Sequence, residues 1–113
     1  MNPNIDVVPS TLDQAVEILY EGLSETDRQF IMARRPSEAR ETLGSAIRNS
    51  WSMGDPTMPL ATWFRRALGV SRAHDTSDLV LRGLWAKVRG EPFELQTLVD
   101  DIKLYWTRLG EDP

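Results

Sequence analysis

The sequence predicts an all-α protein, a compact single domain built as a bundle of five or six short helices. Apolar residues recur at helical spacing in several segments, and helix-starting and helix-ending residues flank them. No segment alternates apolar and polar residues as a strand would. With 113 residues, of which 41% are hydrophobic, the chain is long enough to bury one core.

The expected domain spans residues 10–110. Residues 1–9 contain two prolines and no apolar period, which indicates an N-terminal arm, and residues 111–113 form a short C-terminal tail. The first helix is expected to start at Thr11, because Thr11 and Gln14 have the spacing of a capping box. Gly22 is the expected end of this helix.

Ser24 and Asp27 repeat the capping pattern and predict a second, short helix. Its inward residues are expected to be Phe30 and Ile31. Pro36 ends it, because the residue before a proline avoids the helical region.

A third helix is expected from Ser37, as its N-cap, to about Trp51. Residues 52–59 have the composition of a loop. A fourth helix then runs from Leu60 to its stop at Gly69.

A loop is expected from Val70 to Thr76. The fifth helix, from Leu79 to Val88, is apolar nearly all round and should lie at the centre of the bundle, with Gly83 allowing a neighbour to approach closely. Gly90 and Pro92 are expected to end it. The sixth stops at Gly110, and its apolar residues form one stripe: Leu95, Leu98, Val99, Ile102, Tyr105, Trp106 and Leu109.

The net charge of −4 is divided into blocks. Residues 1–27 carry six acids and no base, residues 28–90 carry eleven bases against five acids, and residues 91–113 carry six acids against two bases. Such blocks can steer association with a charged partner, although the same pattern fits charges spread over solvated helix faces.

Several function classes find no support in the sequence. The chain has no cysteine, which excludes thiol catalysis and zinc–thiolate sites. No phosphate loop, dinucleotide fingerprint or zinc-protease motif is present, so no cofactor and no metal are expected. No apolar run is long enough for a membrane span and no signal peptide is recognisable, so a cytoplasmic protein is expected.

Two segments carry more specialised polar residues than a helical bundle requires. The first, GSAIRNSW, holds Arg48 and Asn49 at the edge of the core and Trp51 one turn on. These side chains could bind an anion, a ribose or a base. Alternatively, Asn49 caps the helix and Arg48 pairs with a carboxylate. Of the four tryptophans, Trp51 is the one expected to be exposed, as an anchor for a partner.

The second segment, RAHDTSD, contains Arg72, His74, Asp75 and Ser77, followed by Asp78. The simpler interpretation is that Asp75 is the N-cap of the fifth helix and Asp78 favours its positive end. A single histidine gives too few ligands for zinc. No glycine-flanked elbow presents Ser77 as a nucleophile.

The order of these segments resembles an uncharacterised domain family found in bacteria and often in phage genomes. Its members carry a G-x-x-I-R-N-x-W segment and a later H-x-D-D-x-S segment. Arg48, Asn49 and Trp51 match the first, and Asp75 and Ser77 match the second. Arg72 stands at the family's histidine and His74 at its first aspartate, so the resemblance implies a helical domain and no reaction.

Three functions follow as expectations. The leading one is a small non-enzymatic protein–protein interaction protein, plausibly phage-encoded and acting on a host complex that binds nucleic acid, for example as an anti-CRISPR or other anti-defence inhibitor. The alternative is a small-ligand or nucleotide-binding domain around Arg48, Asn49 and Asp75. A weaker alternative is a DNA-binding regulator, whose candidate contacts are the arginines Arg65, Arg66, Arg72 and Arg82.

Overall fold

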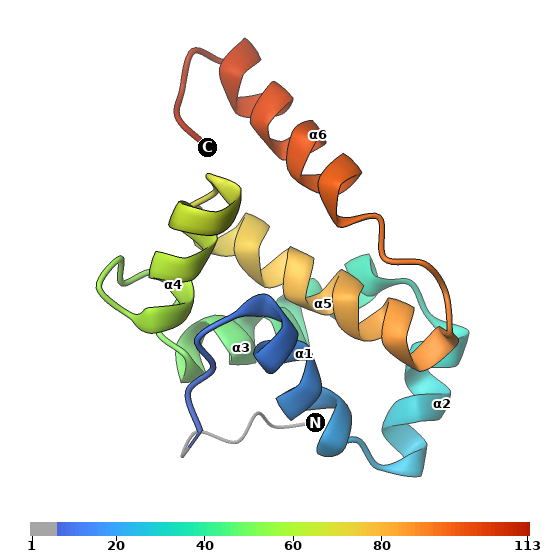
Figure 1. Cartoon of the computed structure of the whole chain (residues 1–113). Coiled ribbons are helices and arrows are strands. Elements are labelled where there is room, and N and C mark those ends of the chain that lie inside the picture. Colours follow the sequence, from blue (N-terminus) through green and yellow to red (C-terminus); the bar gives the residue numbers. More distant parts are fainter. Residues whose placement is uncertain (1–6) are drawn as a thin grey trace.

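The computed structural model, which describes residues 7–113, is all-helical, and no strand occurs in that range (Figure 1). Six α-helices are joined by a 3₁₀ segment, η1, and two π-helical segments, η2 and η3. In chain order they are α1 (Leu12–Glu21), α2 (Glu25–Ala33), η1 (Pro36–Ala39), η2 (Arg40–Gly44), α3 (Ser45–Ser50), α4 (Pro59–Trp63), η3 (Phe64–Leu68), α5 (Ala73–Arg89) and α6 (Leu95–Arg108). The predicted helical bundle is confirmed. Residues 1–6 of the predicted arm lie outside the described residues.

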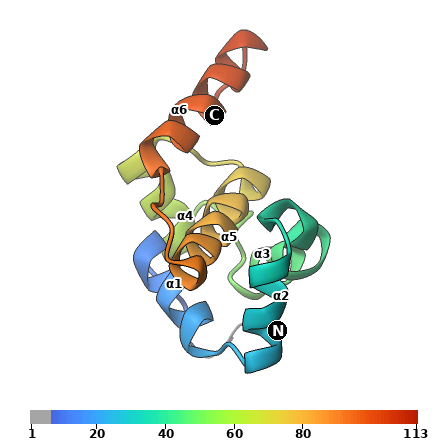
Figure 2. The same ribbon diagram turned by 90° about the vertical axis from the view of Figure 1, so that its right-hand side faces the viewer.

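The central helix is α5, as predicted. Helices α1, α2 and α3, with η1 and η2, pack around it (Figures 1 and 2). A Cβ added at Gly83 would lie 2.9 Å from Val16 Cγ2 and 3.1 Å from Phe93 Cε2. Only a residue without a side chain lets α1 and the segment after α5 come this close.

Both predicted capping motifs at the start of the chain are present. Thr11 Oγ1 accepts a hydrogen bond from the Gln14 backbone N–H at 3.2 Å, while the Gln14 side chain accepts from the Ser10 N–H at 2.8 Å. Ser24 and Asp27 form the reciprocal pair, at 3.1 and 3.0 Å. These side chains satisfy N–H groups that the first turn of a helix leaves without partners.

The predicted third helix is present as a continuous helical path formed by η1, η2 and α3. The prediction that Ser37 caps it was wrong. The N-cap position is occupied by Arg35, the residue before Pro36, because η1 already starts at Pro36. The Arg35 backbone N–H donates to Glu38 Oε2 at 2.7 Å. With a proline at the first position, which has no N–H to satisfy, this turn starts without a serine cap.

The fifth helix starts earlier than predicted, at Ala73, within the segment expected to be a loop. Thr76 and Ser77 are buried there. Their hydroxyls donate to backbone carbonyls one turn earlier, those of Ala73 (3.3 Å) and His74 (3.1 Å). This bonding satisfies hydroxyls that otherwise favour loops and caps. Asp75 as N-cap was also wrong, because Arg72 occupies that position and Asp75 lies inside the first turn.

Three predicted helix ends are confirmed at glycines with a left-handed backbone: Gly69 (φ 70°), Gly90 (φ 66°) and Gly110 (φ 73°). Glycine adopts this conformation without steric cost and so ends helices readily.

Two predictions of burial were wrong. Ile31 is buried as expected, but Phe30 beside it is 38% exposed. Helix α6 forms as predicted, yet its apolar stripe is only partly covered, and Tyr105 (59%) and Leu109 (57%) are exposed. Figure 1 shows the cause, because the C-terminal half of α6 extends beyond the end of α5 and has no helix over its outer face.

None of the helices in residues 7–113 combines the length and the apolar character that crossing a membrane requires.

Candidate functional site

A polar pocket of about 220 Å³ lies between η2, α3 and the first turns of α5. It brings together three of the residues that the sequence singled out: Arg48, His74 and Asp75. The other lining residues are Arg40, Glu41 and Asp78. The two polar segments of the sequence therefore meet in space, but Asn49, Trp51 and Ser77, which the ligand-binding hypothesis also places in one pocket, do not line it.

Arg48 and Ser77 are hydrogen-bonded to each other across this site. Arg48 Nη1 donates to Ser77 Oγ at 3.0 Å, and Ser77 Oγ donates to the His74 carbonyl at 3.1 Å. Ser77 is 1% exposed. Its hydroxyl proton is already donated and its oxygen already accepts from a cation, so Ser77 acts as an anchor for Arg48.

Asp78, which also lines the pocket, binds two arginines. Its Oδ1 accepts from Arg40 Nε at 3.0 Å, and its Oδ2 accepts from Arg82 Nε at 3.0 Å. The hydrogen bond and the charge of Asp78 raise the pKa of Arg40 above its ordinary value. The charges of the site balance, because three arginines face three carboxylates: Arg40, Arg48 and Arg82 against Glu41, Asp75 and Asp78.

Asp75 and Arg72 connect the start of α5 to α6. Trp106 Nε1 donates to Asp75 Oδ2 at 2.8 Å, and the Arg72 guanidinium lies 3.5 Å from the centroid of the Trp106 ring. Arg72 also donates to Glu111 at 2.8 Å and to the Asp112 carbonyl at 3.0 Å. Arg72 thus holds the C-terminal segment, and it is not among the residues that line the pocket.

Of the remaining predicted site residues, Asn49 is exposed and does not line the pocket. His74 is exposed at the edge of the pocket. The expected exposure of Trp51 was wrong, because Trp51 is 0% exposed and belongs to the core. It is the residue that ends α3 as its C-cap. Its indole N–H has no hydrogen-bond partner in residues 7–113.

Sequence reasoning missed Arg40, Glu41 and Trp106. Asp78 and Arg82 are four residues apart and form an ion pair on α5, but the helix expected from Leu79 did not include Asp78. Arg40 is 38 residues from Asp78 and Trp106 is 31 from Asp75. No local pattern marks contacts at such separations.

An apolar groove of about 380 Å³ lies on another flank, between α2, the η1–η2–α3 path and α5. Its lining residues are Asp27, Phe30, Ala39, Thr42, Leu43, Ala46 and Trp85. The Trp85 indole N–H donates to the Arg34 carbonyl at 2.8 Å, which fixes the ring. The Phe30 ring, partly exposed, has the Arg34 guanidinium 5.2 Å from its centroid. The groove is therefore bounded by side chains held in place by their own contacts.

No group of three or more histidine, aspartate and glutamate side chains in the described part of the chain is arranged to hold a metal ion.

The fold and these sites define a small all-helical domain with an internally paired polar pocket beside its central helix and an apolar groove on a second flank. The family described as Domain of unknown function (DUF6794) matches residues 8–88, and the chain belongs to this family. The match takes in α1 to nearly the end of α5 and stops before α6. No curated protein and no solved structure matches the chain significantly.

Proposed function

We propose that this protein is a non-enzymatic interaction module that binds a protein partner through the groove formed by Phe30, Leu43, Ala46 and Trp85. The observation that carries the proposal is the groove itself. It is largely apolar, pre-formed by the fixed Trp85 ring, and large enough for one bulky side chain. Partners commonly anchor an aromatic or aliphatic side chain in such a pocket, where water is fully excluded.

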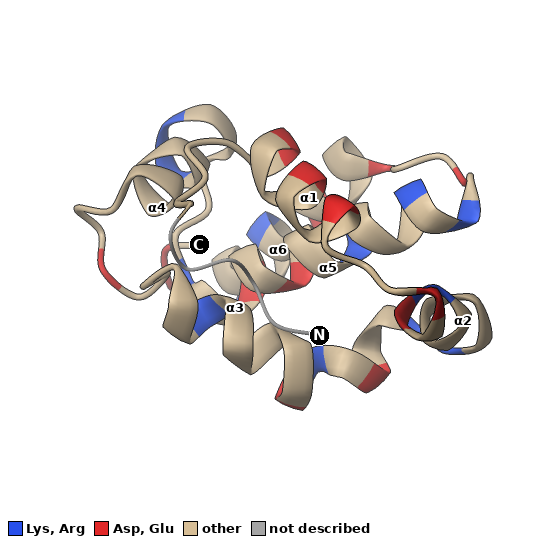
Figure 3. Cartoon of the chain, turned by 90° about the horizontal axis from the view of Figure 1, so that it is seen from below, with Lys and Arg blue, Asp and Glu red and all other residues tan. Residues whose placement is uncertain are grey.

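The charge around the groove specifies the chemistry of the occupant. Asp27 lines the groove and belongs to the acidic block of residues 1–27. Three more acids of this block, Asp13, Glu17 and Glu21, lie four residues apart along α1, whose successive turns are red in Figure 3, but α1 does not line the groove. Among the described residues, Asp27 is the one charged residue in the groove lining, so the occupant is an apolar side chain beside a lysine or arginine that pairs with Asp27.

We propose that the setting is the cytoplasm of a bacterial host, with the protein encoded by a phage. A host complex that binds nucleic acid presents a basic surface, which the acidic block of residues 1–27 would attract. The resemblance to a family often found in phage genomes supports the same setting. Inhibition of such a complex, as an anti-CRISPR or other anti-defence protein, is the concrete form of this proposal.

Affinity purification of the tagged protein from host cytoplasm tests the groove. Ala46→Glu places a charge in the groove, and Ala67→Glu places the same charge on an exposed position of η3 as the matched control. We expect a stoichiometric partner that re-forms the complex from purified components, binds Ala67→Glu normally and loses at least ten-fold in affinity for Ala46→Glu. Binding should also weaken as salt rises.

If the two variants, both folded by circular dichroism, bind the partner equally, the groove is not the binding site. Absence of any reconstituted complex with the unmodified protein would contradict the interaction function as a whole.

The polar pocket supports a second candidate, binding of a small anionic ligand such as a nucleotide. The convergence of Arg40 and Arg48 in one hollow favours it, whereas the bonds of Arg48 to Ser77 and of Arg40 to Asp78 oppose it. A melting-temperature increase with nucleotides, lost in Arg48→Ala, would establish this function. A lower melting temperature in Arg48→Ala and Asp75→Ala that no ligand restores would show that the cluster is structural.

A further inference from the structure

Helix α6 presents an exposed surface that the proposed function does not use. The exposed face of its C-terminal half is lined by Asp101, Leu104, Tyr105, Arg108 and Leu109. The first four lie three, four and seven residues apart and therefore on one side of the helix. Leu104 is 48% exposed and Tyr105 is 59% exposed. The first half of α6 is covered by the core of this chain, with Val99 buried and Leu95, Leu98 and Ile102 packed against it.

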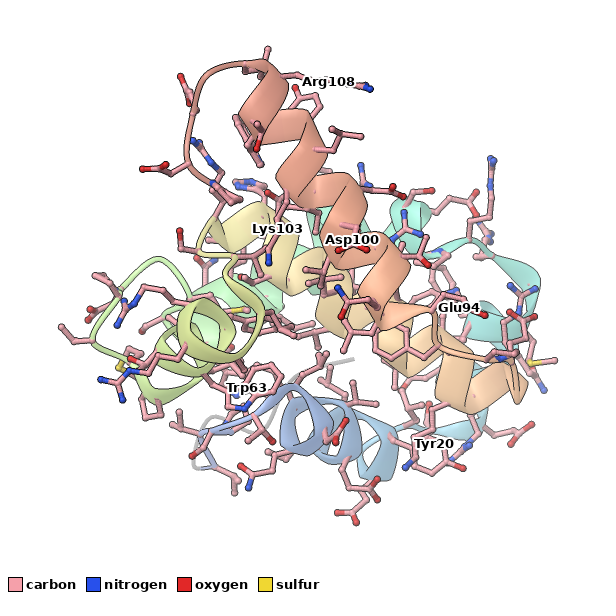
Figure 4. The ribbon with its side chains drawn as sticks, turned by 45° about the horizontal axis from the view of Figure 1, so that its top comes forward. Tyr20, Trp63, Glu94, Asp100, Lys103 and Arg108 are labelled. Atoms are coloured by element: carbon pink, nitrogen blue, oxygen red, sulfur yellow. The ribbon has the colours of Figure 1, made fainter. Side chains whose placement is uncertain are left out.

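The charges on this face are free of intramolecular ion pairs. Neither Asp101 nor Arg108 pairs with an oppositely charged side chain in residues 7–113. Seven residues separate them, about 10 Å along the helix axis, so they are too far apart to pair with each other. Figure 4 shows Arg108 at the far end of α6, pointing away from the body of the protein.

The arrangement of these four residues is self-complementary. The midpoint between Leu104 and Tyr105 is also the midpoint between Asp101 and Arg108. A two-fold axis through that point would place Leu104 against Tyr105 of a second, antiparallel copy. The same axis would place Asp101 against Arg108 twice, once on each side of the apolar contact.

We propose that α6 is a homodimerisation surface on which two copies of this chain pair antiparallel, with the axis between Leu104 and Tyr105. A parallel pair would set Asp101 against Asp101 and Arg108 against Arg108, which like-charge repulsion disfavours. The apolar centre removes exposed leucine and tyrosine surface from water. The face is small compared with stable interfaces, so the dimer dissociates on dilution.

Charge reversal tests the pairing by sedimentation equilibrium over a range of protein concentrations. We expect the unmodified protein to approach twice the monomer mass as concentration rises. Asp101→Arg sets arginine against arginine, and Arg108→Asp sets aspartate against aspartate, so each variant alone should remain monomeric. An equimolar mixture of the two restores both opposite-charge pairs and should dimerise like the unmodified protein.

The direction of the pair is tested with single cysteines, since the chain has no cysteine of its own. Under mild oxidation, Asp101→Cys mixed with Arg108→Cys should give the mixed disulfide in preference to either homodisulfide. Thr107→Arg, an exposed substitution elsewhere on α6, is the matched control and should leave the dimer unchanged. Circular dichroism of every variant confirms that it is folded.

A monomer at every concentration of the unmodified protein would overturn the proposal. So would dimerisation of both charge-reversal variants alone, or homodisulfides formed in preference to the mixed disulfide. The groove on the α2 side is tested separately, because Asp101→Arg leaves it intact and should still bind the groove's partner. Loss of the dimer and loss of that partner are therefore distinguishable.

Discussion

Trp51 and Trp85 are both buried, but in residues 7–113 only the indole N–H of Trp85 has a hydrogen-bond partner. Phenylalanine at either position removes the N–H and part of the ring volume. At Trp85 it also removes the hydrogen bond to the Arg34 carbonyl, which typically stabilises by about 1 kcal/mol. We therefore expect Trp85→Phe to lower the free energy of unfolding by at least about 1 kcal/mol more than Trp51→Phe, measured by urea denaturation.

Gly83 allows a test of close packing at a single position. Alanine would ordinarily favour a helix interior by about 1 kcal/mol, but its Cβ would lie 2.9 Å from Val16, a stiff β-branched side chain. We expect Gly83→Ala to destabilise the protein by about 1–3 kcal/mol. Gly54→Ala is the control, because no atom lies within 4 Å of its Cβ. Equal stability of the two variants would contradict the close approach of α1.

Hydrogen bonds between residues close in the sequence could be predicted, whereas those between distant residues could not. The bonds of Thr11 to Gln14 and of Ser24 to Asp27 span three residues, and their spacing in the sequence was sufficient to predict them. The bond between Arg48 and Ser77 spans 29 residues. The resemblance named both residues, but only the packing of α3 on α5 makes them partners. The burial of Trp51 depends on that same packing.

At the scale of the element, the C-terminal end of α6, beyond the part that packs on the core, is held to the body of the protein by a few defined contacts. Arg72 stacks on Trp106 and bonds to the segment that follows the helix, at Glu111 and Asp112. We expect Arg72→Ala to increase amide hydrogen exchange in residues 103–108 while exchange in α5 stays slow. Arg82→Ala, which breaks a surface ion pair within α5, should leave exchange in α6 unchanged.

Helical periodicity predicted α6 correctly and its burial incorrectly, for a physical reason. An apolar stripe shows that a helix has a face to cover, but it does not identify what covers it. Val99 and Ile102 are covered by the core of this chain, whereas Tyr105 and Leu109, on later turns, extend past it. For α5 the apolar character lies all round, and there the sequence predicted both the helix and its central position.

At the scale of the whole molecule, the all-helical architecture followed from the sequence because each helix has its own starting or ending residue. The sites did not follow in the same way. The polar pocket combines η2, α3 and α5, and the apolar groove combines α2, η1, η2, α3 and α5. Both depend on which helices become neighbours, and no spacing within a single segment encodes that. Phe30 is the clearest case, since its exposure in the groove follows from how α2 is placed beside α5.

The whole molecule should lose stability on acidification through two identified carboxylates. Hydrogen bonding to Lys87 lowers the pKa of Glu17 below its ordinary value of 4.5, and bonds from the Thr57 N–H and hydroxyl lower the pKa of Asp55 below 3.8. The unfolded chain therefore binds protons more readily at both sites. Their stabilisation is present above the ordinary pKa values and is lost as the pH falls through the lowered ones.

We expect the melting temperature to fall as the pH decreases below about 4.5, measured by circular dichroism at low salt. Glu17→Gln combined with Asp55→Asn should melt at a lower temperature than the unmodified protein at pH 7 and should show a shallower decline in acid. Asp112→Asn, which removes a carboxylate from the exposed tail, is the control for net charge. An acid decline of equal steepness in the double variant would mean that other groups control acid unfolding. At high pH the same ion pair is lost through Lys87. Glu17 raises the pKa of Lys87, so the stabilisation from Lys87 is lost only as the pH rises through this raised pKa.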